Sequence, residues 1–170
     1  MFSRVNMKRM ILILLAVLLA GNLYAFDYAS YNLRDLDEII AESKMYDPEQ
    51  TSGQSLLIPP PRIHLYEKLV GYPFKCDGQP VVFILAMALN KTVDEMPSIN
   101  SCMQIESKTG EKIGVFAQDS IAQYIEKEYH PGQKIHLWSL WLFVNSSDKK
   151  PYFVINAIGD AEGPALPGHQ

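Results

Sequence analysis

Four histidines, His64, His130, His136 and His169, are the side chains best suited to metal binding or acid–base chemistry. They show neither a His-x-x-x-His pair nor a Glu-x-x-His pattern, which would place two ligands on one face of a helix. His130 is expected at a helix end, where the dipole favours a cation, and His136 at an exposed strand position. The Gly-x-Ser-x-Gly, Walker and dinucleotide motifs are also missing. We therefore expect no catalytic residue, no metal site, no cofactor and no enzymatic activity.

The chain has two cysteines, Cys76 and Cys102. In an oxidising compartment an isolated pair usually forms a disulfide, which would stabilise the fold by about 3–4 kcal/mol in the chain-entropy estimate. The alternative is a redox pair, but catalytic thiols normally lie close together as Cys-x-x-Cys beside the start of a helix. The wide separation of these two favours a structural disulfide.

Trp138 and Trp141 are the residues best suited to stacking on a ligand, because aromatic rings bind bases and sugars. Both belong to a predicted hairpin over residues 133–158. Side chains three positions apart on a strand point to opposite faces, so at most one of the two belongs to the core. The other ring is covered either by residues 26–46 or by a ligand, and we favour the first.

Residues 1–25 have the pattern of a secretory signal peptide, in which three basic residues precede an apolar run over 10–21 and cleavage follows Ala25. The alternative is an uncleaved membrane anchor, although the run is shorter than the about 20 residues that a spanning helix needs. Cleavage leaves 15 − 3 = 12 basic residues against 19 acidic ones, a net charge of 12 − 19 = −7. This acidic balance disfavours nucleic acid and anionic membrane as partners, so membrane contact is expected only during export.

Residues 26–61 are predicted to form an N-terminal amphipathic helix and a Pro-rich arm. The helix is indicated by four apolar residues at helical spacing, Leu33, Leu36, Ile39 and Ile40. Asn32 is its expected N-cap and Pro48 its stop. Its apolar stripe either packs on the main domain, which we favour, or docks a partner. The arm over 48–61 ends in three prolines and is interpreted as a spacer, with a proline-rich recognition motif as the alternative.

Residues 62–158 are predicted to form one mainly β domain, followed by a flexible tail over 159–170. The segment over 62–70 is ambiguous between a strand and a helical turn, and strands are expected over 81–89, 99–107 and 112–117. A helix follows, capped by Asp119 or Ser120, which turns Ile121, Tyr124 and Ile125 inward and ends at His130-Pro131-Gly132. The hairpin over 133–158 closes the domain. Periodicity cannot separate a strand from a buried helix over 81–89, and the length and β-branched start of this run favour the strand.

The order strand, strand, strand, helix, strand, strand resembles the OB-fold, a five-stranded Greek-key barrel. This resemblance covers roughly residues 80–158 and consists of element order, without a residue motif. It implies an α+β fold that is mainly β, with one helix between strands 3 and 4. It also implies that oligonucleotides or oligosaccharides lie across strands 2 and 3, flanked by loops at 90–98 and 145–151. In combining a signal peptide, a barrel and a disulfide, the chain resembles small exported bacterial proteins and the receptor-binding subunits of bacterial toxins.

We therefore expect a non-enzymatic, exported binding or interaction domain, periplasmic or secreted, that binds a protein partner, a small molecule or an oligosaccharide. Its possible ligand or partner face comprises Gln104, Glu106, Phe116, Gln118, Trp138, Trp141, Lys149 and Lys150. The first alternative is an accessory subunit of a cell-envelope or secreted assembly, similar to a toxin subunit, that docks through the N-terminal helix and the arm. The second is an enzyme without a recognisable motif.

Overall fold

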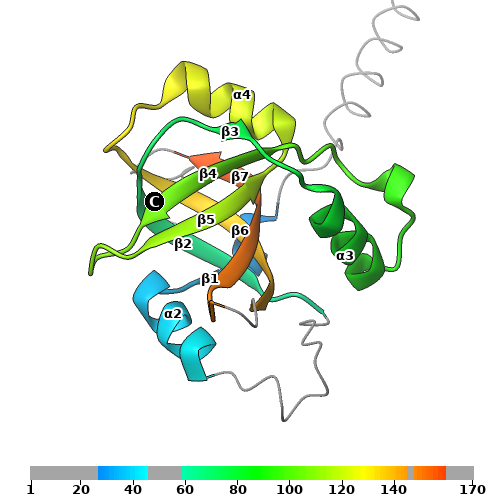
Figure 1. Cartoon of the computed structure of the whole chain (residues 1–170), viewed down its shortest axis with the longest axis horizontal. Coiled ribbons are helices and arrows are strands. Elements are labelled where there is room, and N and C mark those ends of the chain that lie inside the picture. Colours follow the sequence, from blue (N-terminus) through cyan, green and yellow to red (C-terminus); the bar gives the residue numbers. More distant parts are fainter. Residues whose placement is uncertain (1–26, 46–58, 145–147, 160–170) are drawn as a thin grey trace, which may run out of the picture.

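Five strands close into a barrel in the computed structural model, which describes residues 27–45, 59–144 and 148–159 (Figure 1). The barrel strands are β2 (Arg62–Leu69), β4 (Ser101–Glu106), β5 (Lys112–Ala117), β6 (Lys134–Val144) and β7 (Pro151–Gly159). They pair in the order β2-β6-β7-β5-β4, and a pairing of β2 with β4 closes the ring. The β5–β7 pair is parallel and the other four pairs are antiparallel. This topology is compatible with an OB-like fold.

Alternation along the strands fills the barrel interior with apolar side chains. Met103 and Ile105 of β4, together with Ile113 and Val115 of β5, point inward and are buried. The residues between them point outward, as the two-residue period of a strand requires. The mainly β character predicted from the alternating segments is therefore confirmed.

Helices α2 (Leu36–Met45) and α4 (Asp119–Glu128) lie at opposite ends of the barrel (Figure 1). Leu36 and Ile39 of α2 and Ile125 of α4 belong to the same buried cluster as the inward side chains of the strands. The apolar stripe of α2 thus packs on the main domain. The barrel interior is thus filled by side chains and flanked by a helix at each end.

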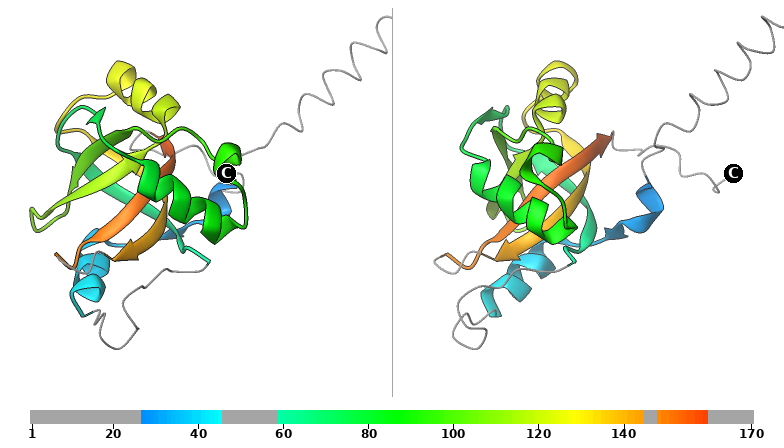
Figure 2. Two further views of the ribbon diagram at one scale, coloured as in Figure 1. Left: turned by 45° about the vertical axis from the view of Figure 1, so that its right-hand side comes forward. Right: turned by 90° about the vertical axis from the view of Figure 1, so that its right-hand side faces the viewer.

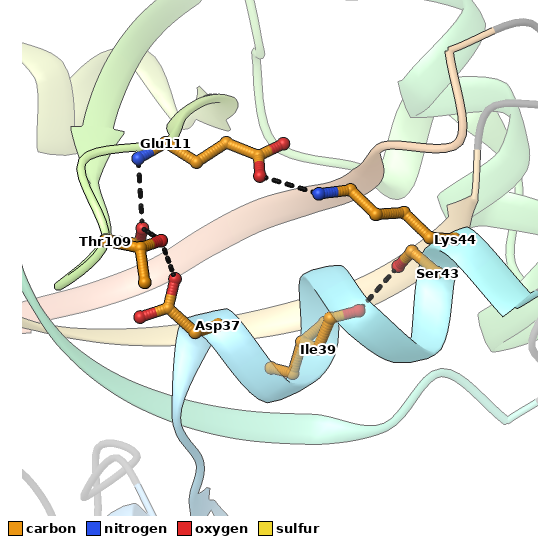
Figure 3. A network of polar contacts seen from close by, with 7 residues as sticks. Asp37, Ile39, Ser43, Lys44, Thr109 and Glu111 are labelled. Atoms are coloured by element: carbon orange, nitrogen blue, oxygen red, sulfur yellow. Dashed lines mark hydrogen bonds and ion pairs between the residues drawn. The ribbon is translucent and has the colours of Figure 1, made fainter.

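Polar contacts also hold α2 against the turn between β4 and β5 (Figure 3). The Thr109 hydroxyl donates a hydrogen bond of 2.6 Å to Asp37 Oδ1. Lys44 Nζ lies 2.8 Å from Glu111 Oε2 at the other end of the helix. The Ser43 hydroxyl donates to the Ile39 carbonyl of its own helix at 2.8 Å, so this buried polar group is satisfied.

The strand predicted over 81–89 is wrong, because these residues form α3 (Gln79–Leu89). The run is rich in Leu, Ala and Met, which are strong helix formers. Pro80 occupies the first turn, where its missing N–H is tolerated, and Asn90 ends the helix in the left-handed region with φ 53°. Helix α3 packs on the outside of the barrel through Val81, Val82 and Leu85, which contact a cluster containing Leu140, Leu142 and Val154. The first barrel strand is instead β2, within the segment whose type the sequence left open.

The N-terminal helix begins later than predicted. Asn32, the expected N-cap, lies in β1 (Asn32–Leu33), which pairs in parallel with β2 and follows a 3-10 helix, η1 (Tyr28–Ser30). Leu33, expected in the apolar stripe, is exposed. The Asp35 carboxylate accepts a hydrogen bond of 2.9 Å from the Asp37 N–H and so caps the start of α2.

The start and the inner side of α4 also differ from prediction. Gln118 is the N-cap and makes no capping hydrogen bond through its side chain. The Asp119 carboxylate accepts a hydrogen bond of 2.9 Å from the Asn100 N–H, in the segment before β4. Tyr124, expected to point inward, is 51% exposed, and Ala122 is buried in its place. Ile121 and Ile125 pack on the core as predicted, so the inner stripe differs from the prediction only in having Ala122 where Tyr124 was expected.

Cys76 and Cys102 form the predicted disulfide, beside the short strand β3 (Phe74–Lys75), which pairs with β4. A second 3-10 helix, η3 (Val93–Glu95), follows α3. Among the described residues, no helix combines the length and apolar character needed to cross a membrane. The predicted signal peptide (1–25), residues 48–58 of the Pro-rich arm and residues 160–170 of the tail lie outside the described residues, whereas Gly159, predicted to begin the tail, ends β7.

Candidate functional site

The predicted ligand face on β4 and β5 is an outward surface built from three rows of directly opposite residues, hereafter the β4–β5 face. The rows are Cys102 with Phe116, Gln104 with Gly114, and Glu106 with Lys112. Directly opposite residues of an antiparallel pair project from the same side of the sheet. The face therefore changes from aromatic at one end, through a neutral middle, to charged at the other.

The middle row leaves the backbone open to solvent. Gln104 and Gly114 are both exposed, and a Cβ added to Gly114 would have no atom within 4 Å. A glycine inside a strand often marks a place where a ligand approaches the backbone closely. This row provides an open floor, with the amide of Gln104 able both to donate and to accept hydrogen bonds.

Aromatic side chains border the floor on two sides. Phe74 of β3 is opposite Cys102 and 53% exposed. On the other side the half-buried Phe116 ring lies 5.9 Å from the Tyr152 ring, which stacks on Phe143 at 4.6 Å. Phe116 also packs against the cluster that includes α3, the helix that lies between β2 and β4 in the sequence. Helix α3 therefore borders the face at its Phe116 end.

The charged end of the face is partly neutralised by an ion pair within the molecule. Lys68 Nζ of β2 lies 2.8 Å from Glu106 Oε1. The hydrogen bond from Lys68 lowers the pKa of Glu106, which keeps this carboxylate ionised. Lys112, opposite Glu106, is exposed. Two lysines against one carboxylate leave this end with a net charge of only +1, far from the basic surface that a strongly anionic polymer requires.

The other predicted residues of the face lie apart from this floor. The Gln118 amide donates to Asn156 Oδ1 at 3.4 Å on the β7 side. Lys149 and Lys150 belong to the β6–β7 connection, where the Lys150 N–H donates a hydrogen bond of 3.1 Å to Asp148 Oδ1. Only part of this connection is described, because residues 145–147 are not. The structure thus brings together Gln104, Glu106 and Phe116 of the predicted set.

The two tryptophans lie on opposite faces of β6, in agreement with their spacing. Trp141 belongs to the interior cluster. Trp138 is on the outer face but only 2% exposed. The Tyr28 ring packs edge-on against it at 4.7 Å, and the His64 ring stacks on it at 4.7 Å. The N-terminal segment therefore covers the outer ring, and neither tryptophan offers an open stacking surface.

A histidine pair on the outer face of β2 and β6 was not expected from the sequence. The Nε2 of His64 and the Nδ1 of His136 lie 2.6 Å apart, within hydrogen-bonding distance. The register places His64 opposite Trp138 and His136 opposite Tyr66. The signal for this arrangement is a repeated pattern, Ile-His-Leu-Tyr over 63–66 and Ile-His-Leu-Trp over 135–138. Antiparallel pairing of the two copies brings the histidines together diagonally.

The surroundings of the pair keep His64 neutral. Burial, followed by the field of His136, lowers the pKa of His64 from 6.5 to about 4. Tyr66 stacks on His136 with a centroid distance of 4.4 Å, which fixes the second ring. One facing nitrogen can donate a hydrogen bond to the other, with the direction set by the tautomers of the two rings.

Within residues 27–45, 59–144 and 148–159, no group of three or more His, Cys, Asp or Glu side chains could hold a metal ion. In comparisons with known proteins, no family model matches the chain and no curated protein matches it. The candidate site therefore rests on its geometry alone.

The predicted ligand face lacked Lys112 and Gly114 of the β4–β5 face and the two aromatic residues that border it, Phe74 and Tyr152. Gly114 could have been found, because it interrupts the alternation of Lys112 to Ala117 at an outward position. Phe74 and Tyr152 could not, because they reach the face through pairing with distant strands.

Proposed function

We propose that this protein is a non-enzymatic, exported binding domain with an OB-like barrel, and that it binds neutral oligosaccharides on the β4–β5 face. The observation that carries this proposal is the floor at Gln104 and Gly114, which combines open backbone, an exposed amide and bordering aromatic rings. Sugars present an apolar ring face and polar hydroxyl edges, and aromatic rings with a few placed polar groups bind both.

Export is supported by the leader-like sequence of residues 1–25 and is compatible with the disulfide between Cys76 and Cys102. The accessory-subunit alternative relied on the apolar stripe of the N-terminal helix. In the structure Leu36, Ile39 and Ile40 of that stripe are buried against the barrel. We therefore favour the binding domain over docking through α2.

The proposal is tested by screening the full-length chain on an array of neutral glycans and measuring each hit by calorimetric titration. Gly114→Arg places a long side chain on the open floor and is expected to weaken binding by at least about tenfold, while the melting temperature stays close to that of the wild type. Gln104→Ala is expected to weaken binding less, since it removes one hydrogen-bonding group.

The matched control is Gln123→Arg, which adds the same side chain at an exposed position of α4. It should bind as the wild type does. The proposal fails if no neutral glycan binds, or if Gly114→Arg binds glycans as tightly as the control. Binding of an extended peptide in place of a glycan would retain the face and overturn the ligand class.

A further inference from the structure

Helix α3 carries an apolar stripe on the side that faces away from the barrel. Its eleven residues include no charged side chain. Phe83 is 56% and Met87 46% exposed, and residues four apart lie on the same side of a helix. Pro80, also exposed, extends the stripe toward the start of the helix. We call Pro80, Phe83 and Met87 the α3 stripe.

The described part of the chain leaves this stripe uncovered. In the right-hand view of Figure 2, α3 lies in front of the barrel, and no other coloured element covers its outer side. A helix that is apolar all round is normally buried all round. The spacing i, i+3, i+7 of the stripe is that of a seam between two packed helices.

We propose that the α3 stripe binds the α3 stripe of a second copy of the chain, with the two helices antiparallel about a two-fold axis. In such an interface residue i contacts j of the partner copy, and j contacts i. A two-fold axis on the outer side of the helix, midway between Phe83 and Met87, places each Phe83 ring against the other copy's Met87. This contact occurs twice, and sulfur–aromatic contacts are favourable.

Charges at the two ends of α3 select the antiparallel arrangement. Asp77 lies at the start, where its Oδ1 accepts a hydrogen bond of 3.0 Å from the Gln79 N–H, and Lys91 follows the last turn. Both are exposed, and neither takes part in the four ion pairs of the described residues. Lys91 does act on Glu95 through its field. Antiparallel packing brings Asp77 of one copy near Lys91 of the other, whereas parallel packing would bring like charges together.

The first test measures self-association of the chain, expressed from its full coding sequence so that any processing takes place. Sedimentation velocity from low micromolar to near-millimolar concentration is expected to show a reversible monomer–dimer equilibrium. Phe83→Asp and Met87→Asp are each expected to raise the dissociation constant by at least about tenfold. Both side chains are exposed, so circular dichroism and the melting temperature should not change. Tyr124→Asp, at a similarly exposed aromatic residue of α4, is the matched control and should dimerise normally.

The second test reads the register. An equimolar mixture of Phe83→Cys and Met87→Cys is expected to cross-link under mild oxidation more than either variant alone. A chain that stays monomeric at every concentration overturns the proposal, as does cross-linking that is strongest within one variant. Unchanged dimerisation of Phe83→Asp would also overturn it. Loss of vesicle binding by Phe83→Asp without any dimer would assign the stripe to a lipid surface.

Discussion

His64 and His136 lie close enough for one hydrogen bond, and burial beside the second imidazole opposes protonation of His64. The neutral form of His64 is favoured in the fold, because burial and the neighbouring imidazole lower its pKa to about 4. In the unfolded chain the pKa of the same group returns to about 6.5. The unfolded state therefore binds a proton that the folded state excludes over the interval between the two values.

We predict that His64 lowers the free energy of unfolding as the pH falls from about 6.5 to about 4, while Glu67 contributes with the opposite sign over much of the same interval. The stabilisation from a neutral His64 is complete above the unfolded pKa and is lost toward the folded pKa, and partial exposure limits the loss to about 1–2 kcal/mol. His64→Gln removes this titration, so the free energy of unfolding of the wild type minus that of His64→Gln should fall as the pH is lowered through this interval. Urea titrations at several pH values measure the difference, with Gln123→Ala, at an exposed non-titrating position of α4, as a control that should keep the wild-type profile. A difference that does not change with pH would contradict the prediction.

At the scale of elements, the position of α3 depends on a close contact at Gly78. This residue precedes the helix and is buried against the segment that leads into β4. A Cβ at Gly78 would lie 1.8 Å from the Ile99 carbonyl oxygen, which is backbone and cannot turn away as a side chain would. The disulfide between Cys76 and Cys102 ties the same two segments together.

We predict that Gly78→Ala lowers the free energy of unfolding by about 2–4 kcal/mol, because the added methyl group forces these segments apart. Gly114→Ala is the matched control. Its Cβ meets no atom within 4 Å, so its effect should stay within about 0.5 kcal/mol. Urea unfolding of both variants measures the difference. Equal stability of the two would mean that the contact at Ile99 relaxes without cost.

At the scale of the whole molecule, the closed ends of the barrel determine the state of a buried acid. Glu67 lies on an inward position of β2 and is almost fully buried near the start of α2. Burial, assisted by the negative charge of Asp35, raises the pKa of Glu67 to about 7. A hydrogen bond from the Leu36 N–H and the positive charge of Lys108 oppose this rise but do not cancel it.

We predict that Glu67 makes the protein less stable as the pH rises from about 4.5 to about 7, because the folded state then holds a proton that the unfolded state has released. Glu67→Gln, which stays neutral, should therefore be more stable than the wild type at about pH 8, by about 1–3 kcal/mol, and similar to it near pH 4.5. Urea titrations at the two pH values measure this. Glu106→Gln, which breaks the ion pair with Lys68, should show no such gain. A gain of equal size at both pH values would point to packing and not to titration.

Much of the barrel could be predicted because its signals are local. The hairpin of β4 and β5 follows from alternating side chains around a short turn, and that of β6 and β7 from two apolar runs around a polar one. Helix α3 could not be predicted, because a run that is apolar at every position has no period to read. Its outer position was likewise hidden, since it depends on a cluster formed by β6 and β7.

The candidate site also contains residues whose positions follow from local sequence signals and residues whose positions do not. By itself, the sequence determined that Gln104 and Phe116 lie outward on neighbouring strands and that Trp138 and Trp141 lie on opposite faces, because the two-residue period of a strand fixes both. Only the tertiary structure decided that Phe74 and Tyr152 border the floor at Gly114, and that His64 meets His136 across 72 positions of sequence. These contacts depend on strand register and barrel closure, which join residues that carry no local signal of one another.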